Sequence, residues 1–182
     1  MNNRRSFLKK SVAVASVLSV PAFARAAAVQ VTAAPGERIL RFQNTHTGES
    51  VKTAFWAEGA FIPEGLAEIN KVLRDHRSNT IAAIDPQLLL LVDQVASRFG
   101  SGKVVHIISG YRSPETNAKL AAASGGVAKH SLHMEAKAID LRIPGVDLKQ
   151  VHKAAMGLGG GGVGYYQDSQ FVHMDTGRKR FW

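Results

Sequence analysis

Two short stretches constrain the fold of this 182-residue chain more than any other feature. They are SLHMEAKAID, Ser131–Asp140, and FVHMD, Phe171–Asp175. Together they offer His133, Asp140 and His173, which can hold a divalent zinc ion only if the fold brings both stretches to one point. Two imidazoles and one carboxylate would leave a fourth position open for water, as in catalytic zinc sites. We therefore expect neighbouring strands to carry a metal site.

The first 26 residues predict an export signal that is cleaved after Ala26. A basic start is followed by the mostly apolar run Ser11–Phe23 and by small residues. The pair Arg4-Arg5 resembles a twin-arginine signal, and an ordinary secretory signal that happens to contain two arginines is the alternative. Either signal predicts a periplasmic protein. The apolar run is too short for a stable membrane anchor.

Charge and composition restrict the partners of the remaining chain, residues 27–182. The full chain has 23 basic and 14 acidic residues. Five of the basic residues and none of the acidic ones precede Ala26, which leaves 18 against 14 and a net charge of +4. No basic run interleaved with aromatic residues indicates nucleic-acid binding. The absence of cysteine excludes a disulfide scaffold and a thiol nucleophile, so the core alone must hold the fold.

Periodicity and turn residues predict one α+β domain: a small antiparallel sheet that carries the zinc site, with helices packed on one side. The expected strands and helices follow the chain in order. They are a hairpin of Arg38–Phe42 and Val51–Trp56, helices 63–75 and 85–100, strand Lys103–Ser109, helix 113–123, strand Ala136–Ile143, helix 147–156, and a hairpin of Val163–Tyr166 and Phe171–Asp175.

The motifs resemble a signature of zinc metallopeptidases that cut bacterial cell-wall peptides. The shared pattern is Ser-x-His, ending at His133, followed by Ala-x-Asp, ending at Asp140. SGYRSPETN (109–117), HTGES (46–50) and GGVGYY (161–166) also match. This group contains D-alanyl-D-alanine carboxypeptidases and dipeptidases and the murein endopeptidases of the lysostaphin and sonic hedgehog fold group. The resemblance covers essentially all of residues 27–182.

The resemblance implies roles for individual residues. His133, Asp140 and His173 would be the zinc ligands. Arg112 would lie beside the scissile carbonyl or a substrate carboxylate, where a guanidinium stabilises developing negative charge; a structural arginine that satisfies loop carbonyls is the alternative. Ser131 would contact a ligand or the substrate, or simply cap the loop.

The chain departs from the family pattern at two positions. Ala136 stands where relatives often have glycine, and Gln170 stands where many have the glutamate that acts as general base. We expect Asp175 to be the base because strand alternation places it on the side of the last ligand. Equally, Asp175 could orient that ligand. Asp168 and His130 are further candidates.

The remaining histidines predict no chemistry. A lone histidine is usually a hydrogen-bonded surface or core residue, and we interpret four of them in this way. They are His46, His76, His106 and His152.

The function that the resemblance implies is zinc-dependent hydrolysis of peptide cross-links in peptidoglycan, including those that join two diaminopimelate residues. Removal of a terminal D-alanine by a carboxypeptidase is one alternative, although the glycine-rich segment 159–164 favours a polymer substrate. A wall-binding protein without catalysis is the other alternative, because of the missing glutamate. Neither nucleic acid nor a membrane is an expected partner.

Overall fold

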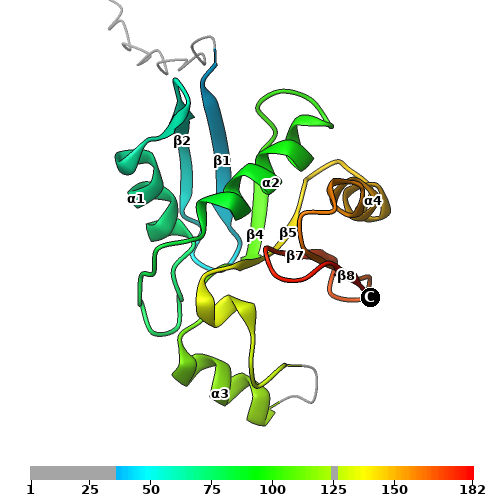
Figure 1. The fold of residues 1–182 in the computed structure, drawn as a ribbon. Helices are drawn as coiled ribbons and strands as arrows, with labels where there is room; N and C mark the ends of the chain where they lie inside the picture. The colour runs from blue at the N-terminus through cyan, green and yellow to red at the C-terminus, as the bar shows by residue number, and fades with distance from the viewer. Residues whose placement is uncertain (1–35, 124–126) are drawn as a thin grey trace, which may run out of the picture. The chain divides into compact units, whose positions relative to one another are not determined.

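The structure, a computed structural model, describes residues 36–123 and 127–182. These residues form one α+β domain (Figure 1), which confirms the predicted class. The predicted export signal, residues 1–26, lies outside the described residues. Within the described ranges, no helix is long and apolar enough to span a membrane. The strands and helices have the following bounds: β1 Arg38–Asn44, β2 Ser50–Ala57, β3 Ala60–Phe61, α1 Pro63–Val72, α2 Pro86–Ser97, β4 Val105–Ser109, α3 Pro114–Ala123, the 3-10 turn η1 Leu132–Glu135, β5 Ala138–Arg142, α4 Leu148–Leu158, β6 Gly162–Tyr166, β7 Phe171–Asp175 and β8 Arg180–Phe181.

The strands form one mixed sheet in the order β3-β2-β1-β4-β5-β7-β6-β8. The prediction of a small antiparallel sheet was therefore wrong. Strands β1 and β4 run parallel, as do β6 and β8, whereas the other pairs are antiparallel. The β1–β4 pair is parallel because the chain between them crosses back through α1 and α2, a connection too long for a hairpin.

Both predicted hairpins are present. Strand β1 pairs with β2, with Phe42 opposite Val51, and β6 pairs with β7, with Tyr166 opposite Phe171. The predicted helices are present too, although α1 ends earlier than expected. Each of α1, α2 and α3 begins with a proline. Proline is favourable in the first turn of a helix, because a backbone N–H at that position would have no hydrogen-bond acceptor within the helix.

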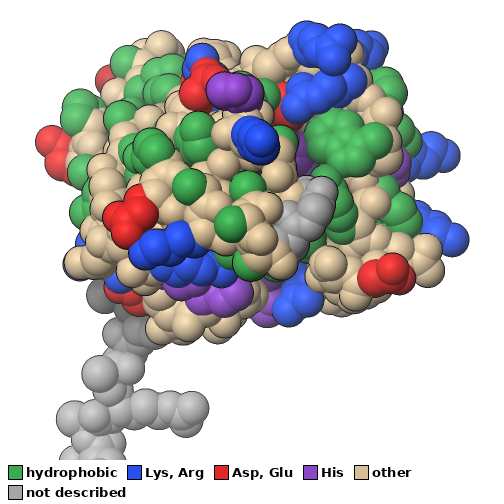
Figure 2. Space-filling model, turned by 90° about the horizontal axis from the view of Figure 1, so that it is seen from below, with side chains coloured by type: hydrophobic (Ala, Val, Ile, Leu, Met, Phe, Trp, Pro, Cys, Tyr) green, Lys and Arg blue, Asp and Glu red, His purple; other side chains and the backbone are tan. Residues whose placement is uncertain are grey.

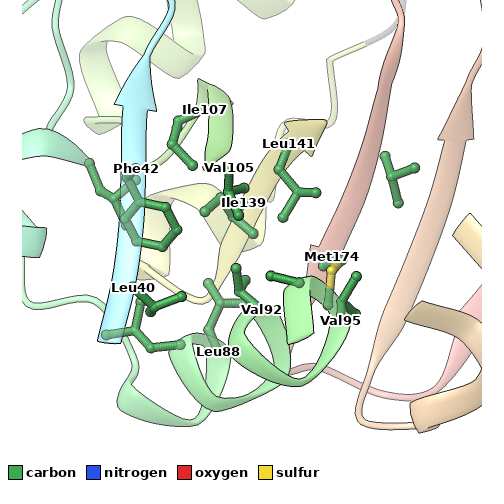
Figure 3. Packing of buried hydrophobic residues seen from close by; sticks show 14 of the residues in the cluster. Leu40, Phe42, Leu88, Val92, Val95, Val105, Ile107, Ile139, Leu141 and Met174 are labelled. Carbon is green, nitrogen blue, oxygen red and sulfur yellow. The ribbon is translucent and has the colours of Figure 1, made fainter. Parts of the chain in front are cut away.

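One face of the sheet carries the hydrophobic core. Alternate strand residues point to this face and pack against α2, which lies across the strands (Figure 3). Helices α1 and α4 also contribute to this cluster, whereas α3 contributes no residue. The strand members that Figure 3 labels are Leu40, Phe42, Val105, Ile107, Ile139, Leu141 and Met174.

The opposite face of the central strands is free for polar side chains. Because neighbouring residues in a strand point to opposite faces, Ile139 and Leu141 in the core turn Asp140 away from it. In the same way, Val172 and Met174 in the core turn His173 away. The sheet therefore separates a packing face from a polar face, and the predicted ligands lie on the polar one.

Candidate metal centre

Two neighbouring strands and a tight turn bring the three predicted ligands together. In the pairing of β5 with β7, Asp140 lies directly opposite His173. His133 comes from η1, the turn that leads into β5. The Ser131 hydroxyl caps that turn by accepting a hydrogen bond from the His133 backbone N–H at 3.3 Å. Ala136 ends the turn in the left-handed region, with φ of 56°, which is a conformation that glycine adopts more easily.

The ligand atoms of His133, Asp140 and His173 all lie within 4.8 Å of one another. Asp140 is the shared neighbour: its Oδ2 is 3.3 Å from His133 Nε2, and its Oδ1 is 2.8 Å from His173 Nδ1. All three residues are buried, with 3%, 7% and 8% of their surface exposed. Three donors that converge from separate elements in this way can hold a single cation.

The outer nitrogen of each histidine has an acceptor that fixes the ring. His133 Nδ1 donates to the Gly110 carbonyl oxygen at 2.7 Å, which leaves Nε2 facing Asp140. His173 Nε2 lies 2.9 Å from Asp175 Oδ2, which leaves Nδ1 for a cation. Metal-binding histidines almost always donate their other N–H to a carbonyl or carboxylate. The donor set therefore fits a zinc ion.

Electrostatics in the pocket favour positive charge. Burial by itself would lower the pKa of His173, but the flanking carboxylates of Asp140 and Asp175 outweigh it and raise this pKa to about 9. Burial would raise the pKa of Asp140, yet the His133 and His173 rings hold it well below its usual range. The ring of His173 thus keeps a second proton between two carboxylates, in a place where a cation can replace that proton.

Asp175 is saturated with hydrogen bonds. Its side chain is 0% exposed, and besides His173 it accepts from Gly162 N at 3.0 Å and Gly177 N at 2.9 Å. Arg180 adds two more donors, at 3.1 and 2.7 Å. Although burial opposes it, these donors hold the pKa of the Asp175 carboxyl well below its usual range.

Arg112 is held beside the ligands by its neighbours in the chain. The flanking residues are tied to the segment after α1: Tyr111 N donates to Leu73 O at 2.8 Å, and Ser113 N donates to Asp75 Oδ2 at 2.9 Å. Arg112 N itself donates to His133 O at 3.1 Å. Burial lowers the pKa of the Arg112 guanidinium. An arginine side chain nevertheless stays charged at neutral pH.

A cleft of about 220 Å³ opens onto this centre. Its wall includes the three predicted ligands, Arg112 and His130, one of the further candidates for the general base. Gln170 and Asp168 are exposed in the turn between β6 and β7 and do not line it. The other residues of its wall are Val127, Ala128, Ser131, Leu132, Tyr166, Phe171, Arg180 and Trp182.

Several of these wall residues did not emerge as site residues from the sequence. Tyr166 stacks on Phe171 with ring centroids 4.5 Å apart, and the Trp182 indole lies 5.3 Å from the His173 ring. The aromatic pair closing GGVGYY was the one available signal, because it directly precedes the last predicted strand. Nothing in the local sequence marks Arg180 or Trp182.

The remaining histidines lie away from the candidate centre. His46 and His76 stack on each other with centroids 4.4 Å apart, and His152 lies against Tyr165. Neither they nor His106 belong to the group that could hold a metal among the described residues.

Comparison with known proteins agrees with the resemblance seen in the motifs. Residues 32–182 match the model of a peptidase family described as "Peptidoglycan L,D-endopeptidase MepK". The protein of that name from Escherichia coli (strain K12) is 43% identical over 182 residues, which cover 100% of this chain and 97% of the relative. The Shigella flexneri protein of that name gives the same values.

A relative from another organism matches a smaller part of the chain. The "Probable peptidoglycan L,D-endopeptidase MepK" of Haemophilus influenzae is 42% identical over 149 residues, 81% of this chain and 80% of the relative. The resemblance to cell-wall peptidases that the motifs indicated is thereby confirmed. This chain belongs to the peptidoglycan L,D-endopeptidase MepK family of peptidases.

Proposed function

We propose that this protein is a zinc-dependent murein endopeptidase that hydrolyses peptide cross-links of peptidoglycan. The observation that carries the proposal is the convergence of His133, Asp140 and His173 within 4.8 Å in a chain of this peptidase family. His133, Asp140 and His173 would hold the zinc. When bound, zinc supplies Lewis acidity, which polarises a carbonyl and lowers the pKa of a water to about 7.

The residues of the chain contribute orientation and charge. The Gly110 carbonyl and Asp175 hold the two histidine rings with their metal-facing nitrogens toward Asp140. Arg112 lines the cleft as a fixed cation, in a position to stabilise negative charge that develops on the substrate. Tyr166, Phe171 and Trp182 form an aromatic wall against which a peptide can pack.

The charge of the surface suits an acidic polymer. Residues 27–182 carry 18 basic and 14 acidic side chains. On the face shown in Figure 2, Lys, Arg and His side chains gather around exposed hydrophobic surface, whereas Asp and Glu side chains are scattered. Positive surface raises the local concentration of an anionic substrate, which supports a wall substrate in preference to a neutral one.

Two residues, Asp175 and His130, are candidates for the general base. Asp175 accepts bonds from His173, Arg180 and two backbone N–H groups and is absent from the cleft wall, so its geometry favours the role of orienting His173. Among the described residues of the wall, His130 is the one besides the predicted ligands that carries an imidazole, the side chain that most often serves as a general base. We assign His130 as the base and Asp175 as the positioning residue.

Two variants separate these roles. His130→Gln is expected to lower kcat by about 100-fold, the ordinary contribution of a general base, with an unchanged dissociation constant for zinc. Asp175→Asn is expected to weaken zinc binding about 10- to 100-fold. Full zinc affinity in Asp175→Asn together with a collapse of kcat would return the base to Asp175.

Digestion of isolated peptidoglycan tests the function itself. Purified residues 27–182 with zinc should convert cross-linked muropeptide dimers into monomers, and a chelator should stop the conversion. His133→Ala should abolish both cleavage and stoichiometric zinc. His106→Ala, which changes a histidine of β4 outside the cleft, is the matched control and should retain both. Unchanged dimers with a zinc-loaded protein would favour a wall-binding role, and release of terminal D-alanine alone would favour a carboxypeptidase.

The localisation that we propose is the periplasm. Residues 1–26 would direct export, with the pair Arg4-Arg5 addressing the twin-arginine pathway, and residues 27–182 would be the zinc metallopeptidase domain. The peptidoglycan substrate, which lies outside the cytoplasm, requires such a location.

A further inference from the structure

Strand β8 approaches the candidate metal centre from an edge of the sheet. It pairs in parallel with β6, with Gly162 opposite Arg180. The backbone beyond it is held as well, since Trp182 N donates to Val163 O at 3.3 Å and Tyr165 N donates to Trp182 O at 2.9 Å. These bonds fix where the side chains of Arg180 and Trp182 lie.

Arg180 holds the carboxylate that holds His173. Its Nη1 donates to Asp175 Oδ1 at 3.1 Å, and its Nη2 donates to Asp175 Oδ2 at 2.7 Å. The same Oδ2 lies 2.9 Å from His173 Nε2. A two-pronged guanidinium–carboxylate pair fixes the plane of the carboxylate as well as its position, so Arg180 sets the direction from which Asp175 meets the ring.

Trp182 packs against both Arg180 and His173. Its indole ring lies 5.3 Å from the His173 ring, and the Arg180 guanidinium lies over it at 5.0 Å. Its Nε1 donates to the Tyr166 hydroxyl at 2.9 Å, which joins it to the aromatic wall of the cleft. The indole thus restrains Arg180 by a cation–π contact and packs beside the His173 ring.

Two glycines of β6 make room for this arrangement. A Cβ at Gly162 would lie 2.5 Å from both Arg180 Nη1 and Asp175 Oδ2, and a Cβ at Gly164 would lie 2.6 Å from the Trp182 ring. Both distances are shorter than real Cβ contacts. A larger residue at either position would therefore displace Arg180, Asp175 or Trp182 from the contacts described above.

We propose that Arg180 and Trp182 are positioning residues of the metal centre, which hold His173 in its metal-binding orientation through Asp175 and through ring packing. The inference rests on the proposed zinc function. It extends the site beyond the residues of the signature motifs to a strand at the edge of the sheet.

Zinc affinity of the purified mature domain tests this role without any assay of cleavage. The metal-free protein is titrated with zinc against a chromophoric chelator. Arg180→Gln is expected to raise the dissociation constant about 10-fold. Because Arg180 acts through Asp175, the double variant Arg180→Gln/Asp175→Asn should bind zinc no more weakly than Asp175→Asn alone. Trp182→Ala should weaken binding, and Trp182→Phe, which keeps an aromatic ring, should restore most of it.

Phe181→Ala is the matched control. Phe181 lies between the two residues in sequence and is 47% exposed, as Trp182 is, but it lines a different hollow; its loss should leave zinc affinity unchanged. Unaltered melting temperatures would show that the variants fold. Wild-type zinc affinity in Arg180→Gln, or losses that multiply in the double variant, would overturn the inference alone. A wild-type protein that binds no zinc would overturn the proposed function together with it.

Discussion

Asp75 is a buried residue that supports the site without touching it. It is 2% exposed, and its Oδ2 accepts from both the backbone N–H and the hydroxyl of Ser113 at 2.9 and 2.7 Å. Its Oδ1 accepts from Arg77 N at 3.0 Å. Asp75→Asn would turn an amide NH2 toward one of these sets of donors. We expect it to lower the free energy of unfolding by about 2 kcal/mol, measured by urea denaturation at pH 7.

The same residue predicts how stability depends on pH. Burial alone would raise the pKa of Asp75, but the hydrogen bonds from Thr116 and Ser113 hold it well below its usual range. A carboxyl whose pKa is depressed in the folded state stabilises the protein fully above its unfolded pKa of about 3.9 and loses that contribution as the pH falls. The difference between wild type and Asp75→Asn should therefore shrink from pH 5 to pH 3.

Asp147→Asn is the matched control for this prediction. Asp147 caps α4 by accepting from Lys149 N at 2.9 Å, and Asn caps a helix about as well as Asp. Its substitution should change stability little at either pH. An Asp75→Asn protein as stable as this control would contradict the anchoring role.

At the residue level, the sequence predicted the candidate ligands but not their support. Short sequence motifs around His133, Asp140 and His173 identify them as candidate ligands. Asp75 and Arg180 are recognisable only by what they contact, because nothing near them in the sequence distinguishes a side chain with such contacts from a solvated one. Their partners, Ser113 and Asp175, come from other elements.

Gly110 sets the distance between the β4 end and the end of α1. A Cβ at this position would collide with the carbonyl oxygen of Leu73, to which Tyr111 N is bonded at 2.8 Å. Gly110 also supplies the carbonyl that fixes His133. Gly110→Ala should therefore separate the two segments, displace Arg112 and lower the melting temperature together with peptidoglycan cleavage.

The control is Gly157→Ala in α4. A Cβ there would meet only the flexible end of Arg98, at 3.3 Å, and alanine is the better helix former by about 1 kcal/mol. This variant should be at least as stable as wild type and as active. Equal melting temperatures for the two glycine variants would show that the close approach at Gly110 is not needed.

Among the elements, hairpins and helices were predictable and the assembly of the sheet was not. The turn after Phe42 and the alternation in Phe171–Asp175 are local signals that identify strands and their nearest partners. The parallel pairing of β1 with β4 depends on the path through α1 and α2, which no local pattern encodes. The short strands β3 and β8 carry too few residues to show any alternation.

In the molecule as a whole, one face of the sheet carries the hydrophobic core and the other carries the candidate metal ligands. Residues such as Ile139 and Met174 pack the core face, and their neighbours Asp140 and His173 lie on the other. A single alternation therefore specifies packing and chemistry together. The arrangement needs no disulfide, since the chain contains no cysteine.

A cysteine-free domain of this kind suits export in the folded state, which is what the twin-arginine pathway carries out. Arg4→Lys/Arg5→Lys keeps the charge of the proposed signal but removes both guanidinium groups, and a receptor that reads the pair would distinguish Arg from Lys. We expect the double variant to remain in the cytoplasm when wild-type and variant cells are fractionated and probed for the protein. Lys9→Arg/Lys10→Arg, a change of equal size outside the pair, should be exported normally. An ordinary secretory signal requires only positive charge ahead of its apolar run, so undiminished export of Arg4→Lys/Arg5→Lys would assign the protein to that route.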